Sequence, residues 1–385
     1  MLSKEGVTQG DLLAMVLYGV ALLPLAEILQ KEQEDDMQPW YADDAAMMGK
    51  APAVASCFEK LIEVGPHFGY HSEPAKSFVI CPLADEAMAK AAFDEKDLPV
   101  KYCRGHRYVG GFVESTAMED RWIEPMVEKW VSGIKALSKV EVRYPQTVYA
   151  GFTQSLQAEW QYLCRCVPGV EKHLGPVEDA IHQHFIPALL EINFEEVSEE
   201  FRHLLSNGVK QGGMNLRNRV KGAARLHKSS SKASEVLAKS LMEGAALDLV
   251  LHKQCVRKAG AEARKERCEE EKAFVKCLME KAPKAAKKRL ERMGETGAWL
   301  TVTPNKLNGT ILSADEWRDN ARLRVGLRPH RLCERCDGCR AGLSIEHALS
   351  CKKGGLVCQR HDDTRDEAGS LAAMALTKSR VSYRP

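Results

Sequence analysis

The chain has 385 residues, 44% of them hydrophobic and 28% charged, which is enough for the cores of two or three domains and excludes a disordered chain. Its net charge is only +2, although the charge is unevenly spread. Thirteen scattered cysteines exclude a small disulfide-rich secreted domain and indicate a reducing, intracellular compartment, nuclear or cytoplasmic.

The first expected element is an apolar helix that includes Leu12 to Ala26. Fifteen uncharged residues are too few to span a bilayer comfortably, and Pro24 lies among them. A signal peptide is not indicated either, because the flanking charges are Lys4 with Glu5 and no clear cleavage site follows. The sequence therefore predicts a buried helix and no membrane contact.

Strands and a second helix are expected next. Residues 40–48 have the pattern of strand, turn and strand, with two adjacent aspartates at the turn. A helix over residues 51–64 ends at a Gly-Pro pair, and β-forming residues predict a strand over 76–82. Residues 98–113 alternate and are expected to form a hairpin that turns at Arg104-Gly105.

Helices are expected from about Glu119 to about Arg292, where apolar residues recur with helical spacing. Residues 202–232 hold eight Lys or Arg and no Asp or Glu, and residues 253–292 hold fourteen against seven. The first run contains several glycines and is expected to be a loop that follows a nucleic-acid backbone. The second is expected to be a long exposed helix, and solvated helix faces are the alternative for both runs.

A cluster of cysteines near the C-terminal end has the spacing of a metal site. Cys336 and Cys339 are separated by two residues. His347 and Cys351 follow at positions i and i+4 of a short expected helix, which Ser344 would cap. Two thiolates from a turn, together with a histidine and a cysteine from a helix, make a closed tetrahedral Zn²⁺ site.

Cys333 leaves the choice of the first pair open. Cys333 and Cys336 have the same spacing as Cys336 and Cys339. The second pair is preferred because Asp337-Gly338 between its cysteines turns easily. A set of unrelated buried cysteines is the alternative to a metal site.

Four short motifs follow one another in the first third of the chain. They are Gln9-Gly10 before a helix, Tyr41-Ala42-Asp43-Asp44 in a hairpin, Lys76 before a strand and Tyr108-Val109-Gly110 in a second hairpin. This order resembles the palm of reverse transcriptases encoded by non-LTR retrotransposons, over about residues 3–115. The cysteine cluster fits the same resemblance, because elements whose endonuclease lies C-terminal to the polymerase carry a Cys-Cys-His-Cys zinc module after the thumb.

The resemblance implies RNA-directed DNA synthesis on an RNA template, with a DNA primer or target and dNTP as partners. Asp43 would be the main Mg²⁺ ligand and Asp44 its supporting partner in two-metal nucleotidyl transfer. Gln9, Gly10 and Tyr41 would shape the surface for template and nucleotide. Lys76 would neutralise phosphate charge. The primer end would be gripped by the hairpin of Tyr108, Val109 and Gly110.

Departures from the family pattern predict that this chain is inactive by itself. A further palm aspartate belongs on a strand before the Gln-Gly helix, and only ten residues precede Asp11. We therefore expect an N-terminally truncated reading frame without polymerase activity of its own. Residues 355–367, with Arg360 and His361, resemble the start of a restriction-like nuclease, but the remaining nuclease residues would lie beyond Pro385.

The sequence thus predicts an α+β protein built of consecutive parts. A partial palm, made of a helix and a small antiparallel sheet, is expected over residues 1–115. The later parts are a helical thumb-like region (116–200), a basic helical or linker region (201–295), a connector (296–330), a zinc module (331–367) and a tail (368–385). The main rival is a non-catalytic nucleic-acid-binding remnant with a zinc module. A product without a stable fold and a zinc-dependent interaction protein are further alternatives, and the oligomeric state is left open.

Overall fold

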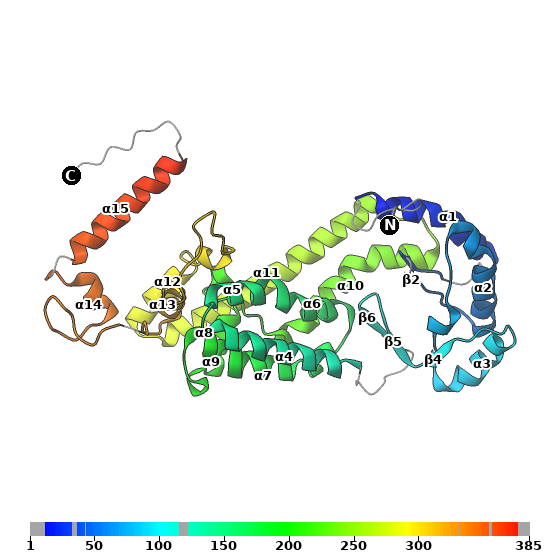
Figure 1. The fold of residues 1–385 in the computed structure, drawn as a ribbon, viewed down its shortest axis with the longest axis horizontal. Coiled ribbons are helices and arrows are strands. Elements are labelled where there is room, and N and C mark those ends of the chain that lie inside the picture. The colour runs from blue at the N-terminus through cyan, green and yellow to red at the C-terminus, as the bar shows by residue number, and fades with distance from the viewer. Residues whose placement is uncertain are drawn as a thin grey trace.

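A computed structural model of the chain describes residues 12–32, 37–42, 44–114, 122–330, 332–353 and 356–375. These residues form a mostly helical protein with small sheets, in agreement with the expected α+β class. Figure 1 shows an elongated molecule. The N-terminal part lies at one end, helices fill the middle, and helices α14 (Ile345–Ser350) and α15 (Leu356–Ala375) lie at the other end.

The N-terminal part combines three helices with three separate pairs of strands in the described residues. Its helices are α1 (Ala14–Glu32), α2 (Ala51–Val64) and α3 (Glu86–Asp94), and its strands are β1 (Trp40–Tyr41), β2 (Asp44–Ala45), β3 (Phe78–Ile80), β4 (Lys101–Cys103), β5 (Gly105–Tyr108) and β6 (Gly111–Glu114). Strands β1 and β2 pair antiparallel, as do β5 and β6, whereas β3 and β4 run parallel. One small antiparallel sheet was expected, and the strands are instead divided into three pairs.

The second hairpin turns at a different place from the one expected. Strands β5 and β6 are joined at Val109-Gly110, and residues 104–105 lie where β4 passes into β5. Val109 and Gly110 both have positive φ, 46° and 76°, which matches the twist that a two-residue hairpin turn must supply. Strand β4 does not fold back on β5, because it is paired with β3 through Val79 opposite Tyr102.

Helix α1 is apolar but mostly exposed, so the expectation of a buried helix is wrong for most of its surface. Only the stripe of Leu22, Leu25 and Leu29 is buried, against helix α2. Val16 and Val20 are 60% and 65% exposed. The stretch Ala14–Lys31 is long and apolar enough to cross a bilayer by length and composition, a test that core helices and signal sequences also pass.

The helical middle is held by one large core and by a smaller apolar cluster around Leu204, Leu290 and Met293. Its helices are α4 (Glu124–Glu141), α5 (Pro145–Gly151), α6 (Gln157–Cys166), α7 (Gly175–Ala180), α8 (Ile186–Leu190), α9 (Glu199–Ser206), α10 (Arg219–Glu243), α11 (Leu249–Lys281), α12 (Lys284–Met293) and α13 (Ala314–Val325). Twenty-eight buried residues from Ile123 to Val325 form this core. It therefore joins the segments that the sequence divided into a thumb, a basic region and a connector.

Two turns of π-helix shape the centre of this core. They cover Phe152–Leu156, between α5 and α6, and Ile181–Phe185, between α7 and α8. Phe152 and Phe185 are fully buried and stack with their ring centroids 4.2 Å apart. Each wider turn thus places one aromatic ring against the other at the point where the two helical segments meet.

Helix α13 fastens the ends of other helices through three arginines, Arg318, Arg322 and Arg324. The last carbonyls of a helix have no partner within it, so buried ones need another donor. Arg318 donates hydrogen bonds to carbonyls at the end of α4, Arg322 to carbonyls at the end of α8, and Arg324 to a carbonyl at the end of α12. The accepting carbonyls are those of Glu141, Val142, Leu190, Glu191 and Met293. The segment 296–330 therefore closes the helical middle as well as connecting it to the zinc module.

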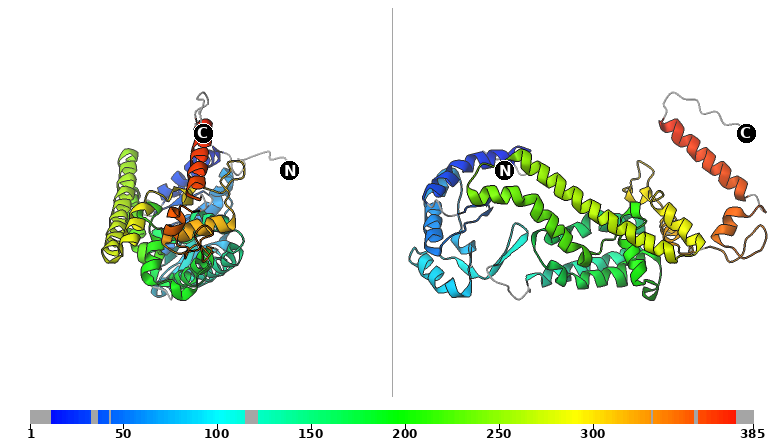
Figure 2. Two further views of the ribbon diagram at one scale, coloured as in Figure 1. Left: turned by 90° about the vertical axis from the view of Figure 1, so that its left-hand side faces the viewer. Right: turned by 180° about the vertical axis from the view of Figure 1, so that it is seen from behind.

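Helices α10 and α11 form a long antiparallel hairpin at one side of the molecule (Figure 2). The Asn218 side chain accepts a hydrogen bond from the Lys221 N–H at the start of α10. Gly244, with φ 60°, ends that helix, and the Asp248 carboxylate caps α11. Much of the first basic run is thus helical, where a loop was expected.

Candidate functional site

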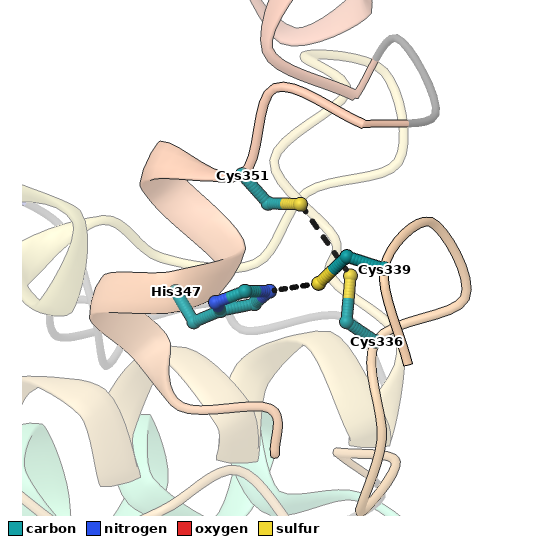
Figure 3. A group of neighbouring side chains, drawn as sticks. All are labelled: Cys336, Cys339, His347 and Cys351. Atoms are coloured by element: carbon teal, nitrogen blue, oxygen red, sulfur yellow. Dashed lines mark hydrogen bonds between the residues drawn. The ribbon is translucent and has the colours of Figure 1, made fainter. Parts of the chain in front are cut away.

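Four side chains with metal-binding atoms gather near the C-terminal end. The ligand atoms of Cys336, Cys339, His347 and Cys351 all lie within 4.8 Å of one another. Figure 3 shows the two thiols of the turn facing His347 of α14 and Cys351, which directly follows that helix. The structure thus brings together the four residues that the sequence selected, and this Cys₃His group could hold a metal ion such as zinc.

Local backbone structure explains why the four side chains converge. Arg335 and Gly342 form an antiparallel bridge, and the Cys336 N–H donates to the Ala341 carbonyl across it. The chain between them turns tightly enough to present both cysteines on one side. Ser344 caps α14 by accepting from the His347 N–H, as expected.

The distances between donor atoms agree with a tetrahedral zinc site. The Sγ atoms of Cys336 and Cys351 are 3.7 Å apart, and the Cys339 Sγ lies 3.1 Å from the His347 Nε2. A tetrahedron with Zn–S bonds of about 2.3 Å has S···S edges of about 3.8 Å. The first distance matches that edge, so little movement of these thiols is needed to accept the ion.

The electrostatics of the cluster favour a thiolate. The pKa of Cys336 is lowered to about 6, first by the backbone N–H of Cys339 and then by the His347 side chain. The thiolate is the form that binds metal, so this cysteine is prepared for coordination near neutral pH. Cys333, the alternative ligand, is exposed and lies outside the group of four.

The two motif hairpins of the N-terminal part are in contact with each other. The Tyr108 hydroxyl donates to the backbone carbonyl of Asp44 over 3.3 Å, across 64 residues of sequence. Burial, followed by the Asp44 charge, raises the pKa of Tyr108. Asp43, Gln9 and Gly10 lie outside the described residues.

Helix α6 supports the turn of the second hairpin. The Tyr162 hydroxyl donates to the Val109 carbonyl over 2.6 Å. A Cβ added to Gly110 would lie 3.0 Å from the Tyr162 ring, so a side chain at this position would press on the ring. The predicted primer-grip residues are therefore fixed between the YADD turn and the first helices of the middle.

The remaining predicted site residues are more loosely placed. Tyr41 lies on β1 opposite Asp44 and is 59% exposed. Lys76 ends a short 3₁₀ turn, is 77% exposed and pairs with Glu73 over 2.9 Å. In the part of the chain that the structure describes, Asp44 belongs to no cluster of three or more metal-binding side chains.

Four of the eight cations of the first basic run form ion pairs within the protein, and the run is partly helical where a loop was expected. Arg202 is buried and holds Glu178 through two hydrogen bonds of 2.6 and 2.8 Å. Burial lowers the pKa of Arg219 to about 10. Arg217, Arg225 and Lys232 pair with glutamates of α11. Sequence reasoning missed these partners because they lie far along the chain.

Comparison of the chain with family models, with curated proteins and with solved structures finds no match. The likeness to reverse transcriptases therefore depends on the motif residues themselves.

Proposed function

We propose that this chain is a reverse-transcriptase-like protein that binds an RNA template and a DNA primer where its two motif hairpins meet. The observation that carries the proposal is the hydrogen bond from the Tyr108 hydroxyl to the Asp44 carbonyl. It joins the YADD turn to the YVGG hairpin, two motifs that are distant in sequence. Their contact supports a common site, as the likeness to a polymerase palm implies.

The chemistry of the site follows from its carboxylates. Asp44, with the adjacent Asp43, offers the oxygen ligands that Mg²⁺ prefers, and Mg²⁺ in such sites stabilises charge on the phosphates of an incoming dNTP. Tyr108, Val109 and Gly110 would position the primer end, because Tyr162 holds their turn in place. Gln9, Gly10, Tyr41 and Lys76 would contact template and nucleotide.

A second candidate function is nucleic-acid binding without synthesis. It is favoured by the surroundings of Asp44, which lacks a cluster of further metal-binding side chains in the described residues. Lys76 is paired with Glu73, so its charge is not free to neutralise a nucleotide phosphate in this conformation. We expect the isolated chain to bind template and primer and not to extend the primer.

A primer-extension experiment separates the two functions. The purified chain is incubated with an RNA template, a labelled DNA primer, Mg²⁺ and four dNTPs, and binding of the same duplex is measured by fluorescence anisotropy. The test variant is Asp43→Asn with Asp44→Asn. The matched control is Asp362→Asn with Asp363→Asn, a second adjacent pair, on the exposed helix α15.

The expected result is binding by all three proteins and extension by none. Extension by the wild type and the control, but not by the YADD variant, would show that the site is an active polymerase. Absence of any duplex binding by the wild type would contradict the proposed function itself.

For the C-terminal cluster we propose Zn²⁺ in a structural role. All four coordination positions would be filled by protein side chains, which is the arrangement of structural zinc rather than catalytic zinc. Cys336 and Cys351 are buried, so the site is closed to solvent on that side.

A further inference from the structure

Many of the positive charges of the second basic run lie at exposed positions. Seven lysines and arginines lie at exposed positions along α11, and we call them the α11 outer face: Lys253, Arg257, Lys258, Arg264, Lys265, Lys272 and Lys276. Apart from an approach of 4.0 Å between Lys265 and Glu269, none of the seven forms an ion pair within the described part of the chain. Lys265 is 77% exposed even so.

Helical spacing places these seven side chains along one side. A spacing of seven residues relates positions 258, 265 and 272, and also positions 257 and 264. A spacing of four relates 253 to 257 and 272 to 276. Residues four or seven positions apart on an α-helix lie on the same face. The seven cations therefore form a stripe from residue 253 to 276, which is about 35 Å long at 1.5 Å per residue.

Three glutamates of α11 form ion pairs with cations of the first basic run. Glu270 pairs with Arg225, and Glu262 pairs with Lys232. The buried Glu271 binds Arg217 and the Gly208 N–H. These glutamates thus pair with three cations of the first basic run, and the seven cations of the α11 outer face are left exposed to solvent.

We propose that the α11 outer face lies along the phosphate backbone of a nucleic-acid duplex over about one turn. This inference rests on the proposed function and names the surface that would hold the template–primer duplex. The stripe is comparable in length with one turn of a B-form duplex, which is about 34–36 Å. Its charges meet phosphates without reading bases, so binding is independent of sequence and strongly dependent on salt.

The composition of the α11 outer face favours a duplex over other polyanions. A single strand is usually held by stacking on aromatic side chains. The only aromatic residue from 253 to 276 is Phe274, and its ring is stacked on His203 at a centroid distance of 3.8 Å. A membrane-surface helix needs a broad apolar face opposite its cations. The positions of α11 outside the stripe include Glu262, Glu266 and Glu270, so they do not form such an apolar face.

The salt dependence of binding tests this surface. Binding of a 24-base-pair RNA–DNA hybrid of arbitrary sequence to the full chain is measured by anisotropy between 50 and 200 mM NaCl. The outer-face variant is Arg257→Gln, Arg264→Gln and Lys265→Gln. The matched control removes three cations of α10 that pair with glutamates: Arg225→Gln, Lys232→Gln and Lys239→Gln.

We expect the outer-face variant to lower the slope of log K against log salt by about 2.7, or about 0.9 for each lost phosphate contact. Over this fourfold range of salt, the wild type would then lose about 40-fold more affinity than the variant. The control is expected to change the slope by less than about one. Charge-conserving changes, Arg257→Lys, Arg264→Lys and Lys265→Arg, are expected to keep the wild-type slope.

Three results would overturn the inference. Equal slopes for the outer-face variant and the control would show that only net charge matters. If the outer-face variant no longer bound phosphatidylserine vesicles that the wild type binds, but bound the hybrid as the wild type does, the surface would be assigned to a membrane. Absence of hybrid binding by the wild type would remove the proposed function as well, whereas in the first two cases that function would stand and only the surface would be wrong.

Discussion

The helical middle and the zinc segment, residues 332–353, are held together by different forces. Twenty-eight buried residues form the core of the helical middle. In the zinc segment only Cys336 and Cys351 are buried, and both belong to the metal-binding group. The first region is thus stabilised mainly by the hydrophobic effect, whereas the second has almost no apolar core, so we expect its fold to depend on a bound metal ion.

The N-terminal part lies between these two extremes. It has two small apolar clusters, one of them between α1 and α2, and its strands occur in separate pairs. An isolated pair of strands is only marginally stable in water. Contacts between pairs, such as the hydrogen bond from Tyr108 to Asp44, are therefore expected to contribute to the stability of this part. Perturbing each region in turn measures how independent the three regions are.

Loss of the metal is expected to have the largest effect and to stay within the zinc segment. Structural zinc contributes about 10–16 kcal/mol of apparent binding free energy to small modules. Cys351→Ser should abolish stoichiometric zinc and the exchange protection of the α14 amides, as measured by metal analysis and hydrogen exchange. The matched control Cys358→Ser, an exposed cysteine outside the group, should retain both. Full zinc content in Cys351→Ser would contradict the assignment.

Removal of a central aromatic ring is expected to have the next largest effect, confined to the helical middle. Trp160 is fully buried and meets Trp130 edge-on at a centroid distance of 5.7 Å. Trp160→Ala should lower the free energy of unfolding by about 3–5 kcal/mol. Tyr144→Ala, at a position 51% exposed, should change it by less than about 1 kcal/mol. Denaturant titration gives these values, and a loss of zinc in Trp160→Ala would show that the regions are coupled.

The buried carboxyl of Glu141 is expected to make the helical middle more stable in acid than at neutral pH. Burial raises the pKa of Glu141 well above its usual value, with Arg318 opposing the shift, and both carboxyl oxygens lack a hydrogen-bond partner. The folded state therefore holds this proton more tightly than the unfolded state. Its contribution to stability is present below the unfolded pKa and is lost as the pH rises through the folded pKa.

Glu141→Gln should consequently raise the free energy of unfolding at pH 7 by at least about 1 kcal/mol. The gain should shrink towards pH 4, where the carboxyl becomes protonated in the unfolded state as well as in the folded state. Thermal or denaturant unfolding at several pH values measures it. Glu128→Gln, on the exposed side of the same helix, is the matched control and should show no such gain.

The smallest effect is expected from the contact that joins the motif hairpins. Tyr108→Phe removes the hydrogen bond to the Asp44 carbonyl and should reduce stability by about 0.5–1 kcal/mol. The change should appear mainly as faster amide exchange in β1, β2, β5 and β6. Tyr144→Phe is the control, and equal exchange in both variants would remove the observation on which the proposed function depends.

The sequence by itself determined those features whose partners lie close together in the chain. Cys336, Cys339, His347 and Cys351 fall within sixteen residues, so their spacing and the Ser344 cap were enough to predict the metal-binding group. Apolar periodicity likewise indicated the helical content from α4 to α12, because a helix depends mainly on its own residues and one buried face.

Only the tertiary structure decided which charges face solvent and which strands pair. The eight cations of residues 202–232 looked free, yet Arg202 and Arg217 are paired with Glu178 and Glu271, which lie 24 and 54 residues away. The apolar run that includes Leu12 to Ala26 predicted a buried helix, but α2 covers only one stripe of α1. Strand β4 could not be assigned to β3 from sequence, because parallel pairing depends on a partner beyond the intervening helix α3. Each of these outcomes depends on side chains that meet only after the chain has folded.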